Sequence, residues 1–150
     1  MLDNLYEVPR GEYLVSTDRA RLDLAVIHGF LTRSYWAQGI PRALVERSIE
    51  HSLPFGLYHA SQQIGFARVI SDTITFAYLA DVFVLEAYQG RGLGKWLVAC
   101  VLSHPALNPM KNWLLLTRDA HGLYRHYGFE TPEDAGRVML LVNRDAIREG

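Results

Sequence analysis

The sequence predicts an α+β fold in which a mixed sheet contains one parallel strand–helix–strand crossover. Residues 82–102 run from an apolar, β-branched segment through a loop with three glycines into a segment of good helix formers. A second apolar run follows at 113–117, so the two strands should be parallel and joined by a right-handed crossover. Earlier in the chain, residues 55–59 and 64–70 alternate with period two, which predicts a β-hairpin.

The N-terminal third is expected to contain a strand and two helices. A short strand is predicted at 12–15, and the potential N-caps at 16–18 precede a helix that should end near Leu31. The pattern is interrupted at 32–41, which predicts a loop, and a second helix should continue to about Ser48.

The remaining elements follow from turn residues and apolar runs. Asp72 should turn the chain from the hairpin into the strand that reaches the glycine loop. Two prolines mark residues 103–109 as a connection. The apolar runs at 113–117 and 138–142 predict the next strand and a last strand.

Composition limits the class of protein. A chain of 150 residues with 49% hydrophobic and 21% charged residues predicts one domain over 1–150. The net charge of −1, without a basic stripe, argues against a nucleic-acid partner. No apolar run is long enough to cross a membrane and no signal peptide is visible, so a cytoplasmic protein without a membrane partner is expected. The single cysteine, Cys100, excludes an internal disulfide and should be a small core residue.

The glycine loop is the strongest candidate for a binding site. Gly90, Gly92 and Gly94 allow backbone conformations that direct several N–H groups toward one point. The following helix begins there, and its first amides lack partners at the positive end of the helix dipole. The sequence therefore predicts an anion site, most naturally for phosphate, in which a side chain at Gly92 or Gly94 would strain the turn and fill the site.

Two common phosphate-binding patterns do not fit this loop. A Walker A loop requires Ser or Thr after Gly-Lys, but Trp96 follows Lys95. A dinucleotide-binding G-x-G-x-x-G that started at Gly92 would need glycine where Leu97 stands. A plain tight turn, with glycine used for helix packing, remains the alternative for the loop taken alone.

Two segments together, the glycine loop and residues 113–129, favour a binding site over a plain turn. Gln89, Gly92 and Gly94 fill the pattern Gln-x-x-Gly-x-Gly, which resembles the acyl-CoA pyrophosphate loop of the GNAT (GCN5-related N-acetyltransferase) family. Residues 113–129 resemble the later block of that family, a strand followed by A-x-x-L-Y-x-x-x-G-F. The matching residues are Ala120, Leu123, Tyr124, Gly128 and Phe129.

The resemblance implies a fold and a co-substrate. The fold would be a three-layer α/β/α arrangement, a mostly antiparallel mixed sheet of about six to seven strands with the central parallel crossover and about four helices. The co-substrate would be acetyl-CoA, with its pantetheine arm bonded to the main chain of Val82 and Val84 where the two parallel strands splay apart. The loop residues Gln89, Gly90, Arg91, Gly92, Leu93, Gly94 and Lys95 would bind the pyrophosphate. Asp119 stands where many members carry an asparagine that contacts the pantetheine, so this contact is in question.

Acetyl transfer to an amine also requires proton transfer. The resemblance places a general acid at Tyr124, whose phenol, with an ordinary pKa of about 10, can protonate the departing thiolate. Tyr127, one helical turn further on, is a rival. Asp81 is the better placed candidate base and Glu86 the alternative, while the main-chain N–H near Val84 would polarise the carbonyl.

The acceptor amine is expected to bind at the loop between the first two helices. Arg33, Tyr35, Trp36 and Gln38 could hold a flat or apolar body and a carboxylate. The aromatic residues could equally pack the helices onto the sheet. The acceptor would be a small molecule or a peptide, and the sequence leaves its identity and the oligomeric state open, a homodimer included.

The histidines do not predict a metal site. His121 and His126 are not on one helix face, and no His-Glu-x-x-His pattern is present. A domain that binds acyl-CoA without catalysing transfer, as a sensor or regulatory module, is the alternative function.

Overall fold

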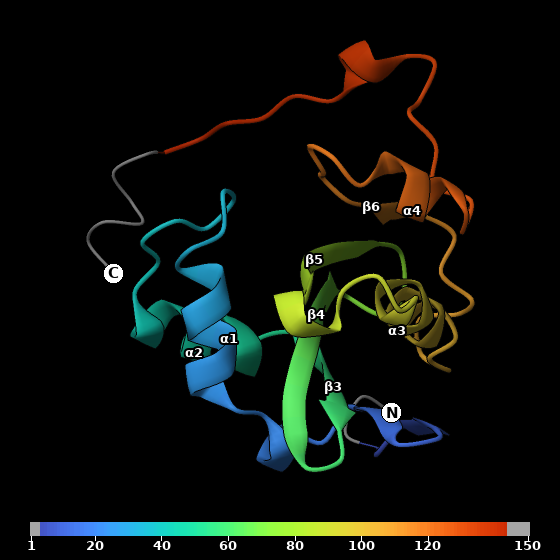
Figure 1. The fold of residues 1–150 in the computed structure, drawn as a ribbon. Helices are drawn as coiled ribbons and strands as arrows, with labels where there is room; N and C mark the ends of the chain where they lie inside the picture. Colours follow the sequence, from blue (N-terminus) through green and yellow to red (C-terminus); the bar gives the residue numbers. More distant parts are fainter. Residues whose placement is uncertain (1–3, 144–150) are drawn as a thin grey trace. The chain divides into compact units, whose positions relative to one another are not determined.

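The fold is described from a computed structural model, which covers residues 4–143 (Figure 1). The chain divides into two compact units, the first ending at Leu115 and the second beginning at Leu116. The first unit holds a six-stranded sheet in the order β1-β2-β3-β4-β5-β6. Neighbouring strands are antiparallel except for β5 and β6, which are parallel. The strands are β1 (Glu7–Arg10), β2 (Tyr13–Ser16), β3 (Leu53–His59), β4 (Gln62–Ser71), β5 (Ala77–Val84) and β6 (Trp113–Leu114).

Four α-helices lie among the described residues. They are α1 (Leu24–Leu31), α2 (Arg42–Glu50), α3 (Leu93–Leu102) and α4 (His121–Arg125), the last in the second unit. Because α3 joins the parallel strands β5 and β6, the predicted crossover is confirmed. The mixed, mostly antiparallel sheet and the four helices also confirm the predicted fold class.

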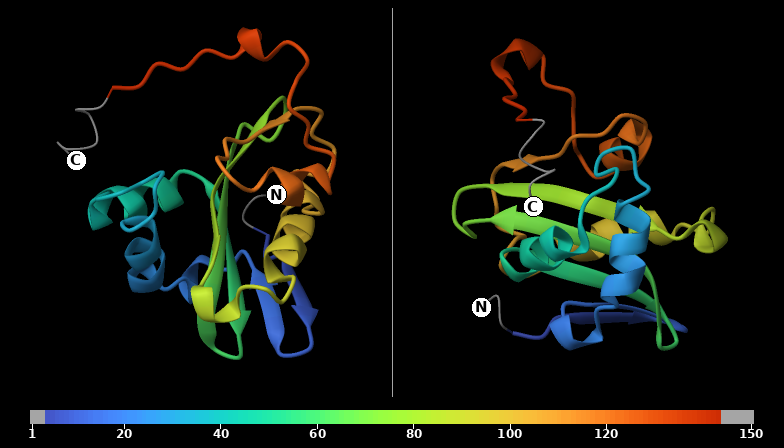
Figure 2. Two further views of the ribbon diagram at one scale, coloured as in Figure 1. Left: turned by 45° about the horizontal axis from the view of Figure 1, so that its top comes forward. Right: turned by 90° about the vertical axis from the view of Figure 1, so that its left-hand side faces the viewer.

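In the first unit, helices cover both faces of the sheet (Figure 2). Helices α1 and α2 pack on one face, and α3 packs on the other against β4 and β5. The first interface contains Phe66 of β4 and Phe83 of β5 among side chains of the two helices. Its buried members are Ile27, Leu31, Val45, Ile49, Phe66 and Phe83. These two packed faces fix the position of β5, from which the candidate site extends.

The N-terminal strand β1 was not predicted from the sequence. Its four residues include Pro9 and two charged side chains, a composition that is typical only of edge strands. The strand pairs with β2 alone, so it is an edge of the sheet.

The predicted continuous helix from 16–18 to Leu31 is wrong, since Leu22 is extended and divides it. Asp18 caps a short 3-10 helix at Arg19–Arg21, and Asp23 caps α1 by accepting a hydrogen bond from the Val26 amide. Two capping carboxylates in succession start two separate helices.

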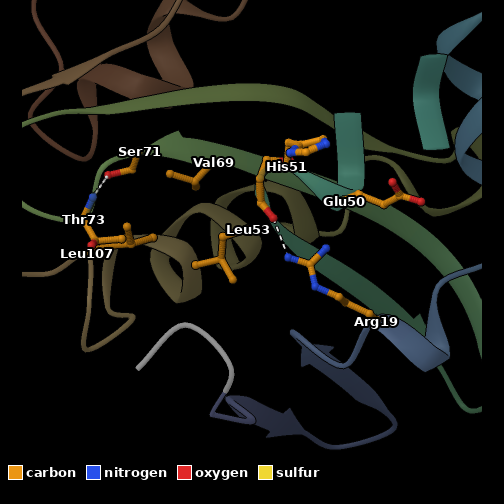
Figure 3. Close-up of a pocket in the computed structure, with 9 residues that line it drawn as sticks. Arg19, Glu50, His51, Leu53, Val69, Ser71, Thr73 and Leu107 are labelled. Carbon is orange, nitrogen blue, oxygen red and sulfur yellow. Dashed lines mark hydrogen bonds between the residues drawn. The ribbon is translucent and has the colours of Figure 1, made fainter. Parts of the chain in front are cut away.

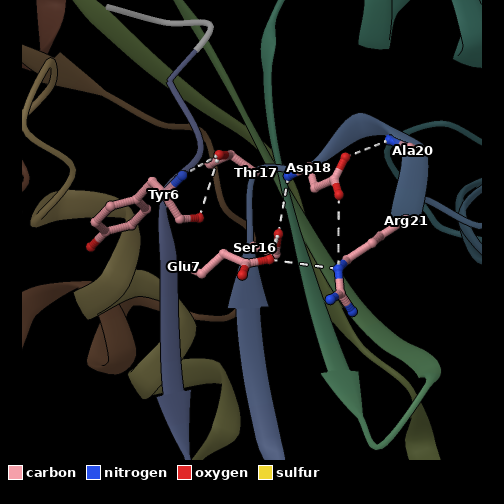
Figure 4. A network of polar contacts seen from close by, with 7 residues as sticks. All are labelled: Tyr6, Glu7, Ser16, Thr17, Asp18, Ala20 and Arg21. Carbon is pink, nitrogen blue, oxygen red and sulfur yellow. Dashed lines mark hydrogen bonds and ion pairs between the residues drawn. The ribbon is translucent and has the colours of Figure 1, made fainter.

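Polar side chains fasten β1 to the start of this 3-10 helix (Figure 4). The Ser16 hydroxyl, which is buried, donates to the Glu7 carboxylate at 2.7 Å and accepts from the Asp18 amide at 3.1 Å. The Glu7 carboxylate lies 3.5 Å from Nε of Arg21. The Tyr6 amide donates to the Thr17 hydroxyl at 3.0 Å. Side chains thus anchor an edge strand that has only one neighbour in the sheet.

The second unit contains α4 and a 3-10 helix at Ala135–Arg137. The strand predicted at 138–142 is not formed, and Met139 and Leu141 of this segment are almost fully exposed. The strand predicted at 113–117 is limited to the two residues of β6. A run of apolar residues predicts a strand only when another strand is available to pair with it.

Candidate functional site

The glycine loop leads from β5 into α3, as the sequence predicts. Gly90 and Gly92 have φ angles of 82° and 75°, in the left-handed region that favours glycine. An added Cβ at either position would meet no atom within 4 Å, so the surface of the loop is open to a ligand. Gly94 lies within α3 without a positive φ, so the expectation that a side chain there would strain the turn is wrong.

The N-terminus of α3 has the properties of an anion site. Gly92 is the N-cap and supplies no side chain, and the first helical bond runs from the Trp96 amide to the Gly92 carbonyl. The amides of Leu93 and Gly94 therefore precede the hydrogen-bonded part of the helix, at the positive end of its dipole. A phosphate would satisfy these amides.

The edge of β5 next to this loop is available for main-chain contacts. Strand β6 pairs with β5 only at Ala77 and Tyr78, so the parallel pairing stops well before β5 ends. On the other side of β5, the Leu85 amide donates to the carbonyl of Ile64 at 2.8 Å. Successive residues of an antiparallel strand point their N–H and C=O groups alternately to its two sides. Val84 therefore directs its N–H and C=O away from β4, toward the edge of β5 that β6 no longer pairs with.

The side chain of Gln89 supports this geometry. Its amide group donates to the Val84 carbonyl at 2.8 Å, which fixes the end of β5 against the start of the loop. The N–H of Val84 faces the same edge. This is the main-chain donor that was expected to polarise the carbonyl of the acetyl group.

A β-bulge interrupts β5 beside this edge. Phe66 is opposite Phe83 and Arg68 is opposite Ala80, so two residues of β5, Asp81 and Val82, lie opposite one residue of β4. Asp81 takes the left-handed conformation, with φ of 56°, which aspartate tolerates better than most residues. The bulge aims the Asp81 side chain at the sheet face that α1 covers.

Both carboxylate oxygens of Asp81 accept hydrogen bonds. Nε of Arg68 donates to Oδ2 at 2.9 Å, and the indole Nε1 of Trp36 donates to Oδ1 at 2.9 Å. The side chains of Arg68 and Asp81 are only 14% and 13% exposed, so the ion pair is largely shielded from water. The candidate base is thus held in one orientation by an arginine that the sequence analysis did not identify.

The loop that was expected to bind the acceptor lies next to Asp81. The rings of Tyr35 and Trp36 are 5.1 Å apart, and both residues are partly exposed. Phe30 of α1 lies 6.2 Å from Trp36 and stacks on Phe83 of β5 at 4.1 Å. Phe30 therefore packs α1 onto the sheet, and Trp36 links this aromatic group to the carboxylate. The expected role of the loop in acceptor binding stays a prediction.

Arg33 has a structural role in addition to any role in binding. Its Nε donates to the carbonyl of Gly29 at 2.7 Å, near the C-terminus of α1, where carbonyl groups lack helical partners. The guanidinium therefore contributes one exposed hydrogen bond to the end of α1.

Tyr78 of β5 is a further member of this region. Burial raises the pKa of its phenol, the nearby Asp81 carboxylate raises it further, and Arg68 opposes the rise. The hydroxyl therefore stays protonated at neutral pH. A longer alternation analysis that allowed for the bulge would have placed Tyr78 on the same face as Arg68, but no motif marks either residue.

The second unit carries the remaining candidate residues, Tyr124, Tyr127 and Asp119. Tyr124 is buried in α4 and lies 5.8 Å from the ring of Phe129. Helix α4 ends at Arg125, and Tyr127 lies in the following turn, where its amide donates to the Tyr124 carbonyl at 3.0 Å. Asp119 is two-thirds exposed and lies 3.8 Å from Nη2 of Arg118.

A pocket of about 260 Å³ lies at the other end of the sheet, between α2 and the ends of β3 and β4 (Figure 3). Its one arginine, Arg19, points at the C-terminus of α2 and donates to the carbonyls of Ile49 and Ser52 at 2.7 and 2.6 Å. With its cation already bonded, this pocket is a weaker candidate for anion binding than the glycine loop.

Residues 4–143 hold neither a cluster of metal-binding side chains nor a membrane-spanning helix. They contain no group of three or more His, Cys, Asp or Glu side chains placed to hold a metal ion. They also contain no helix with the length and apolar character that a membrane span requires.

The chain belongs to the GNAT family of acetyltransferases. A family model described as acetyltransferase (GNAT) domain matches residues 50–131, which include the β5–α3 loop, α3 and α4. A protein of Gibberella zeae, named as a candidate acetyltransferase, is 32% identical over 77% of this chain and 77% of its own length.

Solved structures show the same fold. A candidate GNAT acetyltransferase from Xanthomonas campestris is 45% identical, with a TM-score of 0.85 over 93% of this chain and 98% of its own. A GNAT acetyltransferase from Elizabethkingia anophelis, solved with acetyl-CoA bound, is 15% identical. Its TM-score is 0.63 over 81% of this chain and 78% of its own, so it supports the fold alone.

Proposed function

We propose that the protein is an N-acetyltransferase that transfers the acetyl group of acetyl-CoA to a primary amine of a small molecule or peptide by direct attack in a ternary complex. One observation carries this proposal. The uncapped N-terminus of α3, opened by Gly90 and Gly92, adjoins the edge of β5 that β6 leaves after Tyr78. An anion site and a free strand edge side by side suit a ligand with a diphosphate and an amide-containing arm.

The residues of the loop and strand would divide the binding of acetyl-CoA. The loop from Gln89 to Lys95 takes the diphosphate, with the amides of α3 as donors. The main chain of Val82 and Val84 takes the arm, and the N–H of Val84 polarises the thioester carbonyl. The co-substrate supplies the activated acetyl group, and Asp119 is a further candidate for a contact to the arm.

Proton transfer would involve one carboxylate and one phenol. An alkyl amine with a pKa of about 10.4 is protonated at neutral pH and must lose a proton before attack. Asp81 accepts this proton, in an orientation fixed by Arg68 and Trp36. Tyr124 donates a proton to the thiolate that leaves. Arg33, Tyr35 and Trp36 hold the acceptor.

The alternative is a domain that binds acyl-CoA without transfer. The observation in its favour is that both oxygens of Asp81 are already hydrogen-bonded, which makes the carboxylate less available to an amine. The two functions share the cofactor site and differ only in chemistry.

Two measurements separate these cases. Calorimetric titration with CoA should show binding to the wild type and none to Gly92→Glu, in which a side chain is forced into the left-handed region and adds negative charge at the phosphate site. Release of thiol from acetyl-CoA is then followed with a panel of amines, amino acids, peptides and aminoglycosides. Binding with amine-dependent thiol release supports the transferase, binding without release supports the sensor, and equal CoA affinity in the two proteins removes the basis for both.

A further inference from the structure

A second cationic pocket adjoins the glycine loop. It has a volume of about 280 Å³ and lies between the turn that connects β1 to β2 and the start of α3. Arg91 of the loop and Leu93, the first residue of α3, form one wall. The opposite wall consists of Arg10, Gly11, Glu12 and Tyr13. The pocket thus begins where the predicted diphosphate site ends, but its chemistry comes largely from the N-terminal hairpin.

The two arginines of this pocket have no carboxylate partner among residues 4–143. The guanidinium of Arg10 lies over the ring of Trp96, 5.5 Å from its centroid. That of Arg91 lies over the ring of Tyr88 at 5.1 Å and donates to the Tyr13 hydroxyl at 3.3 Å. Aromatic rings position both cations without neutralising them, so both can still bind an anion.

The one acidic residue of the pocket is bonded elsewhere. Oε2 of Glu12 lies 3.0 Å from Nε2 of His59, and the other ring nitrogen of His59 lies 2.9 Å from the Tyr88 hydroxyl. The ring of His59 also stacks on Tyr13 at 5.0 Å. This chain of contacts holds the Glu12 carboxylate at the imidazole, and the pocket keeps its positive character.

We propose that this pocket binds the phosphate monoester on the ribose of CoA, with Arg10 and Arg91 as its ligands. The inference rests on the proposed function, because it needs the diphosphate to lie on α3. CoA carries its third phosphate on the same ribose as the diphosphate. When the diphosphate lies on the glycine loop, this third phosphate can therefore reach a cationic site next to the loop. A volume of about 280 Å³ is below the usual range for whole cofactors but sufficient for a phosphate with part of a sugar.

The test compares CoA with 3′-dephospho-CoA, which lacks only this phosphate. Calorimetric titration of the wild type should show about tenfold tighter binding of CoA, as expected for charge-assisted hydrogen bonds to one phosphate. Arg10→Gln should lose most of this preference, because CoA should bind the variant more weakly while dephospho-CoA keeps its wild-type affinity. Arg47→Gln is the matched control, since this arginine is exposed on α2, on the other face of the sheet, and it should keep the tenfold preference.

Two results would overturn the proposal and leave the proposed function intact. One is equal binding of CoA and dephospho-CoA to the wild type, and the other is an Arg10→Gln variant that keeps the preference for CoA. An equal loss of affinity for CoA and dephospho-CoA in Arg10→Gln also contradicts the proposal, because Arg10 would then act on the loop and not on the phosphate. Absence of binding by both ligands to the wild type would refute the proposed function together with this inference.

Discussion

The indole Nε1 of Trp36 donates a hydrogen bond of 2.9 Å to the carboxylate of Asp81, which joins the loop after α1 to the bulge in β5. The same carboxylate pairs with Arg68. A left-handed aspartate, a largely buried arginine and an exposed indole therefore form one unit at the edge of the proposed acceptor site. Backbone conformations of this kind carry a free-energy cost and concentrate at functional sites.

Asp81→Asn tests whether this carboxylate is the base. Asparagine adopts the left-handed region readily, so the bulge should persist. The variant should lose about 3 kcal/mol of stability because the charge of Arg68 is left without its partner. If Asp81 accepts the proton of the amine, kcat at neutral pH should fall by about 10²–10⁴-fold and then rise with pH as the acceptor deprotonates by itself. Steady-state rates from pH 6 to 10 and chemical denaturation check both effects.

Trp36→Phe is the companion variant. It removes the indole N–H but keeps a ring beside Tyr35 and Phe30, so kcat should fall only severalfold. A large loss of stability in Asp81→Asn with nearly unchanged kcat would make the carboxylate a structural partner of Arg68 and would favour the sensor.

The sequence predicts the part of the site that depends on local backbone chemistry. Gly90 and Gly92 need their residue type for local reasons, and the strand–loop–helix around them is found as predicted. The partners of Asp81 depend instead on sheet register. The bulge shifts the alternation of β5 by one residue, and period-two patterns cannot reveal such a shift before the pairing with β4 is known.

Tertiary context also accounts for the errors at the two ends of the chain. Strand β1 contains proline and charges and is held by side chains such as Ser16 and Thr17, which local propensity does not weigh. The apolar residues 138–142 have the composition of a strand but form none in the described part of the chain. Propensity is a weak guide where pairing decides the outcome.

Tyr124→Phe tests the general acid. Phenylalanine retains the edge-to-face contact with Phe129, so the fold should be preserved while the hydroxyl is lost. Turnover should fall by about 10²–10⁴-fold with nearly unchanged affinity for CoA. Tyr127→Phe, in the turn after α4, should have a much milder effect. If the two effects are reversed in stopped and continuous thiol assays, the acid is Tyr127.

Arg33→Ala tests the acceptor loop. The Gly29 carbonyl loses its donor, so the variant should be less stable by about 1 kcal/mol. If the loop binds an anionic acceptor, the KM of that acceptor should also rise severalfold while the KM of acetyl-CoA stays constant. Arg47→Ala on α2 is the exposed control. A lower melting temperature with an unchanged acceptor KM would make the loop a scaffold only.

His104 should make stability depend on pH. Its ring is buried between Tyr6 and Phe55, and its Nδ1 accepts a hydrogen bond from the Ala106 amide at 3.1 Å. Burial lowers the pKa of this imidazole below its ordinary value, so the folded protein keeps the neutral form. As the pH falls through about 6.5, the unfolded chain binds a proton that the folded chain does not, and unfolding becomes more favourable.

The stabilising effect of the neutral imidazole is therefore complete above the unfolded pKa and is lost as the pH falls. His104→Asn removes this titration, and the asparagine carbonyl can still accept from the amide two residues on. Urea denaturation between pH 8 and 5 should show a free energy of unfolding that declines more steeply with falling pH in the wild type than in His104→Asn. At pH 8 the His104 imidazole is neutral in both the folded and the unfolded protein. The difference in free energy of unfolding between wild type and His104→Asn at this pH is therefore the baseline for the comparison. Curves that stay parallel down to pH 5 would mean that His104 takes up its proton in the folded protein as readily as in the unfolded chain.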